Sequence, residues 1–423
     1  MQVMPELTPF RRGIALFALA LGGFGIGVTE FATMGLLPDI ARELLPGFEQ
    51  NPDAVIAQAG ILISAYALGV VVGAPVFAVL AARMSQTKLA FWLLGIFVVA
   101  SAASALMPDF GTTAVMRFIA ALPHGAYFGV ASLLAARIMG PGKQGQGVAL
   151  ALSGLTIANI FGVPLATWLG QASGWRYAYI LVAAIFFVTF LLVFFFVPRY
   201  PGNPERSAMK ELIAFKNPRL WIMVAVGAIG FGGFFAVYSY IAEVTTRETG
   251  LGPGIVPWVL ATLGVGMTLG NLIGGWAADR NLTRTMFVGF GSFIASLVFY
   301  SLIASNPVGL FIAVFFLGLT SSSLLPAIQS RLVRIADEAA LLGAAINHAA
   351  FNVGNSLGAW LGGMVIAGGL GYLAPGWVGV VLAVLGMALT ALGVSVERRD
   401  KRHSLDTTGL RTIPAAERAE VGA

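Results

Sequence analysis

The chain has 423 residues, of which 58% are hydrophobic and only 10% are charged, with a formal net charge of +6 and no cysteine. Soluble domains carry about a quarter charged residues, so a water-soluble fold of this composition would expose large apolar patches and aggregate. The absence of cysteine excludes disulfides and thiolate chemistry.

Apolar runs of about 20 residues, the length of a membrane-spanning helix, recur along the whole chain. Barrel strands would instead alternate in polarity over about 10 residues. The first run follows Arg11 and Arg12 and is too long for a signal-peptide core, so we expect it to remain as a helix. We predict an all-α membrane protein of twelve transmembrane helices, at residues 13–37, 54–81, 88–107, 111–138, 146–169, 176–198, 219–244, 254–278, 283–304, 307–333, 340–368 and 373–396.

A polar, proline-containing segment at 199–218 separates two sets of six helices. We therefore predict an N-terminal bundle at 1–198, a cytoplasmic linker at 199–218, a C-terminal bundle at 219–396 and a cytoplasmic, disordered tail at 397–423.

The basic residues fit this order of helices. When the N-terminus is placed inside, every inner loop carries arginine or lysine, and the first outer loop is acidic, with Asp39 and Glu43. Both termini are then cytoplasmic. This topology explains the net charge better than nucleic-acid binding does.

The two halves resemble each other in sequence. Gly69 and Gly73 with Arg83 align on Gly266 and Gly270 with Arg280, and the segment 162–170 aligns on 354–362 at nearly the same offset. These matches pair helix two with helix eight and helix five with helix eleven, which indicates a duplicated six-helix unit, as in transporters that rock two halves around a central site. Glycines at four-residue spacing allow close approach of helices, and we expect them to form a seam between the halves.

Three stretches carry a family resemblance. The loop after helix eight contains Asp279, Arg280 and Arg284, whereas its first-half copy around Arg83 has Ala82 where an Asp is expected. Helix five contains four small or proline residues with regular spacing: Gly154, Ala158, Gly162 and Pro164. Helix four contains Arg117 followed by glycines. With these motifs the chain resembles the major facilitator superfamily, and within it the drug:proton antiporters similar to chloramphenicol-resistance and arabinose-efflux permeases.

The resemblance implies a major facilitator fold of two pseudo-symmetric six-helix bundles in a bacterial-type plasma (inner) membrane. It also implies an antiporter motif in helix five, a cytoplasmic latch at Arg83, Asp279, Arg280 and Arg284, and proton coupling near Arg117. Because Ala82 replaces the expected acid, Asp279 would have to carry the latch.

Glu30 is the only acid clearly within a predicted span, and Arg117 is the only basic residue within one. An ionised carboxylate in hydrocarbon is unfavourable, so Glu30 must face protein or water, have a partner, or hold a proton. Counted along their helices, both residues lie about 8–10 Å from the outer boundary, so they could meet. Proton coupling or substrate contact is one interpretation, and a structural ion pair is the other.

Other polar and aromatic residues within the spans are candidates for a site. His124 fits either a proton relay or a hydrogen bond to a backbone carbonyl. Neutral polar side chains in helix eleven share a face that could line a cavity or bridge helices, and aromatic rings in helix seven offer a surface to an amphipathic ligand. We take the candidates for substrate binding to be Asn159, Phe234, Tyr238, Asn347, His348, Asn352 and Asn355.

Rival functions fit the sequence less well. It contains no nucleotide-binding loop of the G-x-x-x-x-G-K-[ST] type, and three scattered histidines without cysteine assemble neither a catalytic nor a metal site, so we expect no enzyme activity, no cofactor and no metal. A channel or a membrane receptor remains the alternative of another class. We predict a secondary active transporter, a monomer, that exports small organic molecules against protons by alternating access; the alternative within transport is a sugar or nucleoside efflux permease.

Overall fold

The computed structural model describes residues 7–81, 84–140, 142–200, 216–336 and 340–412, and in these ranges the regular structure is entirely helical. The first half of the chain forms α1 (Pro9–Gly35), α2 (Leu37–Leu44), α3 (Pro52–Ala59), α4 (Ile61–Ala81), α5 (Gln86–Leu106), α6 (Phe110–Ala121), α7 (His124–Met139), α8 (Gln144–Ile157), α9 (Val163–Ser173) and α10 (Trp175–Phe196). The second half forms α12 (Pro218–Ala225), α13 (Gly232–Tyr238), α14 (Ile241–Glu243), α15 (Val256–Arg280), α16 (Leu282–Ile303), α17 (Pro307–Ala336), α18 (Ala340–Ala367) and α19 (Ala374–Thr412).

Among the described residues, eleven helical segments are long and apolar enough to cross a membrane. They coincide within a few residues with eleven of the twelve predicted spans. The remaining prediction, 340–368, corresponds to α18, which has 28 residues and no charged side chain. The predicted fold class, an all-α membrane protein, is confirmed.

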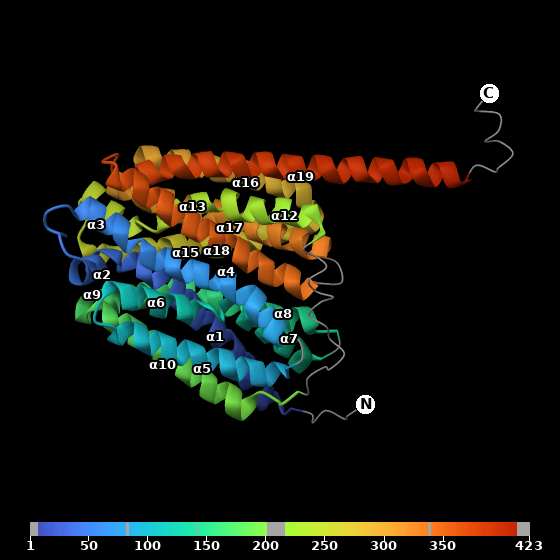
Figure 1. Cartoon of the computed structure of the whole chain (residues 1–423), viewed down its shortest axis with the longest axis horizontal. Coiled ribbons are helices and arrows are strands. Elements are labelled where there is room, and N and C mark those ends of the chain that lie inside the picture. Colours follow the sequence, from blue (N-terminus) through green and yellow to red (C-terminus); the bar gives the residue numbers. More distant parts are fainter. Residues whose placement is uncertain (1–6, 82–83, 141, 201–215, 337–339, 413–423) are drawn as a thin grey trace.

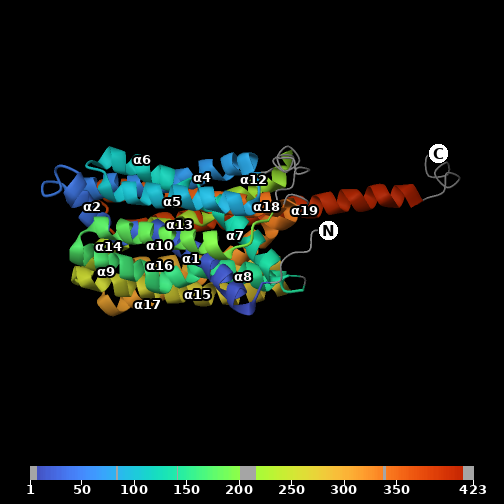
Figure 2. The same ribbon diagram turned by 90° about the horizontal axis from the view of Figure 1, so that it is seen from below.

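The helices lie side by side and form one elongated bundle, and the start of α1 and the end of α19 lie at the same end of it (Figures 1 and 2). We call this end the terminal face and the opposite end, where α2, α3 and α9 lie, the distal face. Helices of each half pack mainly on one another, and the halves meet where α4 packs on α18 and where α9 packs on α15. These two contacts involve the helices that the sequence repeat pairs. The domain boundaries remain a prediction, because residues 201–215 of the linker lie outside the described residues.

The glycine motifs do not form the predicted seam between the halves. A Cβ atom on Gly73 would lie 1.9 Å from the carbonyl oxygen of Leu122, and one on Gly270 would lie 2.0 Å from that of Leu319, so these glycines join α4 to α6 and α15 to α17 within each half. Gly154 likewise faces the Ala20 carbonyl oxygen of α1 at 1.8 Å. The prediction was wrong because glycine spacing shows where a backbone can approach, but not which helix approaches it.

Several membrane-spanning segments are interrupted. Pro123, which cannot donate a backbone hydrogen bond, separates α6 from α7. A π-helical turn, Ala158–Gly162, joins α8 to α9 directly before Pro164. The seventh span contains two more π-helical turns, Val226–Gly230 and Val244–Glu248. Such turns are frequent at functional sites, because an extra residue redirects the side chains that follow.

Two parts of the fold differ from the sequence prediction. The short helix α2 follows α1 at the distal face and was not predicted. The predicted disordered tail is helical as far as Thr412, because α19 continues past the end of the apolar run and projects from the terminal face (Figure 2).

Tryptophan side chains lie mainly on the outer surface of the bundle. Trp175 is buried, with 1% of its surface exposed, whereas the other seven of the eight tryptophans are exposed: Trp92, Trp168, Trp221, Trp258, Trp276, Trp360 and Trp377.

Candidate functional site

Glu30 lies near the distal end of α1, where the two halves of the chain meet. Its side chain is buried, with 6% of the residue exposed. Nδ2 of Asn355, which belongs to α18 of the other half, donates a hydrogen bond of 3.4 Å to Oε1 of Glu30. The predicted intramembrane acid therefore contacts the second half of the chain through a neutral amide.

Arg117 in α6 is also buried, with 1% exposed, and the contacts of its guanidinium group are all with the first half. Nη1 donates a 2.9 Å hydrogen bond to Oγ1 of Thr29, the neighbour of Glu30. The guanidinium carbon lies 4.3 Å from the ring centre of Tyr66 and 5.3 Å from that of Tyr179, which is a cation–π arrangement.

Arg117 retains hydrogen-bonding capacity in this state. Its Nε and Nη2 atoms have no partner among the described residues. No ion pair joins Arg117 to Glu30 in the described part of the chain, so the two residues are close through Thr29 but are not paired. Two unsatisfied donors on a buried cation are suited to an anionic group, either an ionised Glu30 or part of a bound molecule.

His124 follows the break at Pro123, so it begins α7. Its Nδ1 atom lies 3.2 Å from the hydroxyl of Tyr66, and its ring centre lies 5.8 Å from that of His348 in α18. His348 stacks on Phe128 with ring centres 4.8 Å apart. The two histidines therefore come from opposite halves, and Tyr66 links this pair to Arg117.

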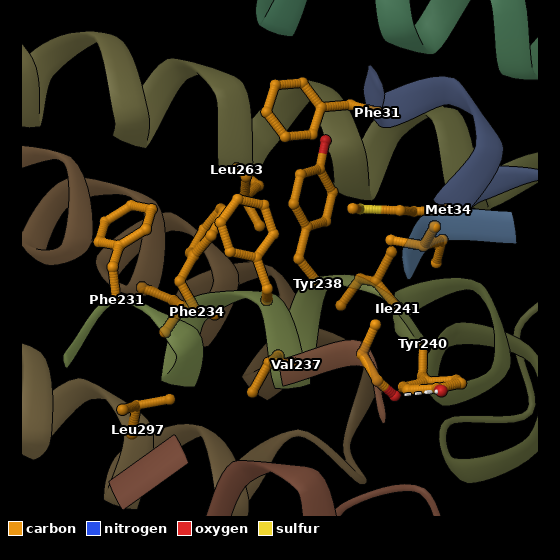
Figure 3. Close-up of a cluster of buried hydrophobic side chains, with 14 of the residues drawn as sticks. Phe31, Met34, Phe231, Phe234, Val237, Tyr238, Tyr240, Ile241, Leu263 and Leu297 are labelled. Carbon is orange, nitrogen blue, oxygen red and sulfur yellow. Dashed lines mark hydrogen bonds between the residues drawn. The ribbon is translucent and has the colours of Figure 1, made fainter. Parts of the chain in front are cut away.

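The aromatic residues of the seventh span form a buried cluster with α1 (Figure 3). Phe31, next to Glu30 in sequence, stacks on Tyr238 with ring centres 5.3 Å apart, and Tyr238 in turn contacts Phe234 at 5.2 Å. Both predicted aromatic candidates thus belong to a buried cluster that includes Phe31, the sequence neighbour of Glu30.

The remaining predicted asparagines are buried, but they do not form one group. Asn159 lies in the π-helical turn of the fifth span, and its Nδ2 atom donates to the carbonyl of Leu155. Nδ2 of Asn352 donates to the carbonyl of His348 on the same helix. The Oδ1 atoms of Asn159, Asn347, Asn352 and Asn355 have no partner among the described residues. These oxygens are available acceptors at the contact between the halves.

The predicted antiporter motif packs on the helix that carries Glu30. Gly154 lies against Ala20, a Cβ on Gly27 would lie 2.7 Å from that of Ala158, and a Cβ on Gly162 would lie 2.5 Å from Cγ2 of Val28. Pro164 follows the π-helical turn. The motif therefore fixes the position of α1.

Of the predicted latch residues, the three that the structure describes form no ion pair with one another: Asp279, Arg280 and Arg284. Asp279 is exposed at the terminal face, and no ion pair forms between it and the described residues. The guanidinium of Arg280 stacks on Trp276 at 3.6 Å, and the backbone N of Arg284 donates to Oδ1 of Asn281. Arg83 lies outside the described residues.

Sequence reasoning missed four residues of this region. Thr29, Tyr66 and Tyr179 surround Arg117, but a hydroxyl or an aromatic ring in an apolar span gives no signal that distinguishes a buried position from a lipid-facing one. Glu243 lies near the end of a predicted span, where an acid is usually interfacial, but it is 2% exposed and forms an ion pair with Arg247.

Comparisons of the sequence with known proteins all point to one family. The family model of the Major Facilitator Superfamily matches residues 19–251 and 237–419. The chain is 37% identical over 384 residues to "Inner membrane transport protein YdhP" of Escherichia coli K12, a match that covers 91% of this chain and 96% of that protein. It is 32% identical to "Putative transporter AraJ" of the same organism, with 93% and 97% covered, and 30% identical to a chloramphenicol resistance protein of Streptomyces lividans, with 88% and 94% covered.

Among solved structures, a bacterial homologue of the human lysosomal transporter Spinster, in an inward-facing and unoccupied conformation, superimposes with a TM-score of 0.71 at 15% identity. The match covers 92% of this chain and 98% of that one, which shows the fold. The twelve spans, the duplicated halves, the family match and the relatives agree: the chain belongs to the major facilitator superfamily, and it is a multi-pass membrane transporter.

Proposed function

We propose that the protein is a proton-coupled exporter of small organic molecules, in which Glu30 binds and releases the transported proton. One observation carries this proposal: Glu30 is a buried carboxyl group within a membrane span, and its hydrogen-bond partner belongs to the opposite half of the chain. A change in the charge of Glu30 therefore acts directly on a contact between the halves, and alternating access requires such a dependence.

Arg117 supports the same role. An uncompensated charge inside a membrane is unfavourable, and the two unpartnered donors of Arg117 supply a nearby countercharge when Glu30 is ionised. Thr29 holds the guanidinium beside the acid. His124, Tyr66 and His348 extend the line of polar groups from Arg117 to the second half.

The substrate class follows from the surfaces beside Glu30. The rings of Phe31, Tyr238 and Phe234 supply apolar contact, and the free acceptors of the asparagines in α18 supply polar contact. This combination suits a small amphipathic molecule. The chloramphenicol resistance protein among the relatives supports export of drug-like compounds.

The orientation is part of the proposal. The start of α1 and the end of α19 lie at one face of the bundle. We assign this terminal face to the cytoplasm, because the sequence places its basic loops on the side of the N-terminus and the positive-inside rule puts such loops inside. A bacterial inner membrane is the membrane named for the E. coli relative.

The experiment is transport by proteoliposomes containing the wild type or Glu30→Gln, which keeps the shape of the side chain but cannot ionise. We expect Glu30→Gln to lose accumulation driven by a pH gradient and to retain substrate exchange without a gradient. Glu49→Gln, the same substitution at an exposed carboxylate, is the control and should behave as the wild type. Accumulation by Glu30→Gln against a substrate gradient would show that Glu30 is not the coupling acid.

The substrate panel for this assay should contain amphipathic drug-like compounds, sugars and nucleosides. Saturable transport of sugars alone would favour the alternative within transport. Ion current at diffusive rates would favour a channel.

A further inference from the structure

A group of charged and hydroxyl side chains joins the two halves at the distal face. Asp53 belongs to α3 of the first half, whereas Arg247 lies in the π-helical turn Val244–Glu248 and Tyr372 lies between α18 and α19, both in the second half. Nη1 of Arg247 lies 3.5 Å from Oδ1 of Asp53, and the hydroxyl of Tyr372 donates a 2.6 Å hydrogen bond to the same oxygen. One carboxylate of the first half is therefore held by two side chains of the second.

The second half holds Arg247 and Tyr372 in position for this contact. Nε of Arg247 pairs with Glu243, one helical turn earlier, which is almost completely buried. The backbone N of Tyr372 donates a 3.0 Å hydrogen bond to Oε1 of Glu248, and the Arg247 guanidinium lies 5.5 Å from the centre of the Tyr372 ring. When Asp53 moves away, these contacts within the second half can remain.

A cavity of about 150 Å³ lies beside this group, between the halves, and Arg247 belongs to its wall. Its lining includes Gly35, Asp39 and Arg42 from the first half and Ala242, Glu243 and Arg247 from the second. Burial raises the pKa of the Asp39 carboxyl, and the charge of Arg42 opposes this rise. The cavity reaches Gly35 at the distal end of α1, the helix that carries Glu30.

Contacts between the halves continue from this group toward the centre. The hydroxyl of Ser64 in α4 lies 3.4 Å from the carbonyl of Ser356 in α18. Gly60 lies so near Tyr240 that an added Cβ would be 2.7 Å from its hydroxyl. At the terminal face, by contrast, Asp279 forms no ion pair with the described residues. Among the described residues, charged side chains therefore join the halves at the distal face.

We propose that Asp53, Arg247 and Tyr372 form the outer gate of the transport path. We also propose that substrate passes through the cavity beside Arg247 before it leaves the protein. The contact between Asp53 and the pair of residues from the second half stabilises the state closed to the distal face. The contact breaks when that face opens. Arg247 then keeps its ion pair with Glu243, so its charge still has a partner. The assignment of the distal face to the outside of the cell rests on the proposed function. The gate between the halves does not depend on that assignment.

The size of the effect follows from the exposure of the pair. The side chains of Arg247 and Asp53 are 34% and 43% exposed, so water screens their attraction. Removing one charge should shift the balance between closed and open states by roughly two- to fivefold, the range for pairs of this exposure. The shift is small enough for folding to persist and large enough to measure.

The absence of native cysteine allows a direct test. Ala242→Cys places one thiol in the wall of the cavity, at a position that is 2% exposed in the closed state. Labelling by a water-soluble maleimide is then timed in purified protein in detergent, with Asp53→Asn, Arg247→Gln or Tyr372→Phe added. We expect each addition to accelerate labelling roughly two- to fivefold.

Arg176→Gln is the matched control, because Arg176 pairs with Glu43 at the same face and both belong to the first half. It should leave the labelling rate unchanged. The proposal is overturned if Asp53→Asn and Tyr372→Phe leave the rate unchanged, or if Arg176→Gln raises it equally. Tyr372→Phe removes only a hydroxyl, so it supplies an answer even if the charge variants fail to fold. The assay needs neither proton nor substrate, so its failure is separate from failure of the test on Glu30.

Discussion

Asn355 is the residue through which the second half of the chain contacts the buried acid of the first. Its amide nitrogen donates to Glu30, whereas the amide of Asn352, one turn earlier on α18, donates to its own helix. Two asparagines of the same helix therefore have different hydrogen-bond partners. Asn355 connects the halves, whereas the Oδ1 atom of Asn352 has no partner among the described residues, and we propose it as a substrate contact.

This difference leads to a prediction for Asn355→Ala. The change removes one hydrogen bond to an ionisable group, which is worth about 1.5–3 kcal/mol, so we expect proton-driven transport at saturating substrate to fall roughly ten- to a hundredfold. Asn352→Ala should change the substrate concentration at half-maximal rate and leave the maximal rate nearly intact. Initial rates in proteoliposomes separate the two effects. An equal loss of maximal rate in both variants would contradict the special position of Asn355.

Glu30 itself could be predicted from sequence, because an acid in a long apolar run is conspicuous. Its partner could not, because Asn355 lies 325 residues away and only the packing of α18 on the first half brings them together. Glu243 was missed for a related reason. Its place near the end of an apolar run is typical of a membrane boundary, but its side chain is buried and borders a cavity that α2 and α15 also line.

Two glycines of α15 have different surroundings, because only one of them lies against α17. A Cβ on Gly270 would lie 2.0 Å from a backbone oxygen of α17, whereas a Cβ on Gly275 would meet no atom within 4 Å. A backbone oxygen in a packed helix cannot move aside as the end of a flexible side chain can. The two positions are five residues apart on the same helix, which makes them a matched pair.

We expect Gly270→Ala to destabilise the protein by about 1–3 kcal/mol, the usual effect of overpacking. Gly275→Ala should be neutral or stabilising by up to about 1 kcal/mol, because alanine favours a helix more than glycine does. Thermal unfolding of the detergent-purified variants measures both. Equal melting temperatures would mean that α15 and α17 separate easily, contrary to their close packing.

The positions of the helices could be read from the sequence because each apolar run has the length of a span and is bounded by charged or turn-forming residues. The breaks within spans were less visible. Pro123 gives a local signal, but the π-helical turns of the seventh span depend on how that helix packs. The charged residues after Glu397 resembled a disordered tail, although α19 continues through them.

Among the described residues, the ion pair and the side-chain hydrogen bond that join the two ends of the halves lie at the distal face. Asp53, Arg247 and Tyr372 join the halves at the distal face, while the exposed Asp279 lies without an ion pair at the described part of the terminal face. A latch at Asp279 would then belong to the opposite state, in which the terminal face is closed. The sequence repeat predicted two moving halves, but it could not predict which state the chain adopts.

We therefore expect Asp279→Asn to slow turnover without weakening substrate binding, because it removes a contact of the opposite state and not of the binding site. Turnover in proteoliposomes and the dissociation constant of the substrate in detergent should be measured on the same preparation. Asp109→Asn, at an acid that caps α6 on the distal face, is a suitable control. Unchanged turnover would remove the latch role from Asp279.

The distribution of tryptophan determines which parts of the protein contribute to its intrinsic fluorescence. Seven of its eight indole rings lie on the surface of the bundle, and Trp175 alone is enclosed, where its Nε1 donates to Glu43. Its ultraviolet emission therefore comes almost entirely from rings that border lipid or interfacial water. A quencher attached to lipid acyl chains would suppress most of this emission and leave the contribution of Trp175. The remaining fluorescence would then report on the distal end of the first half alone.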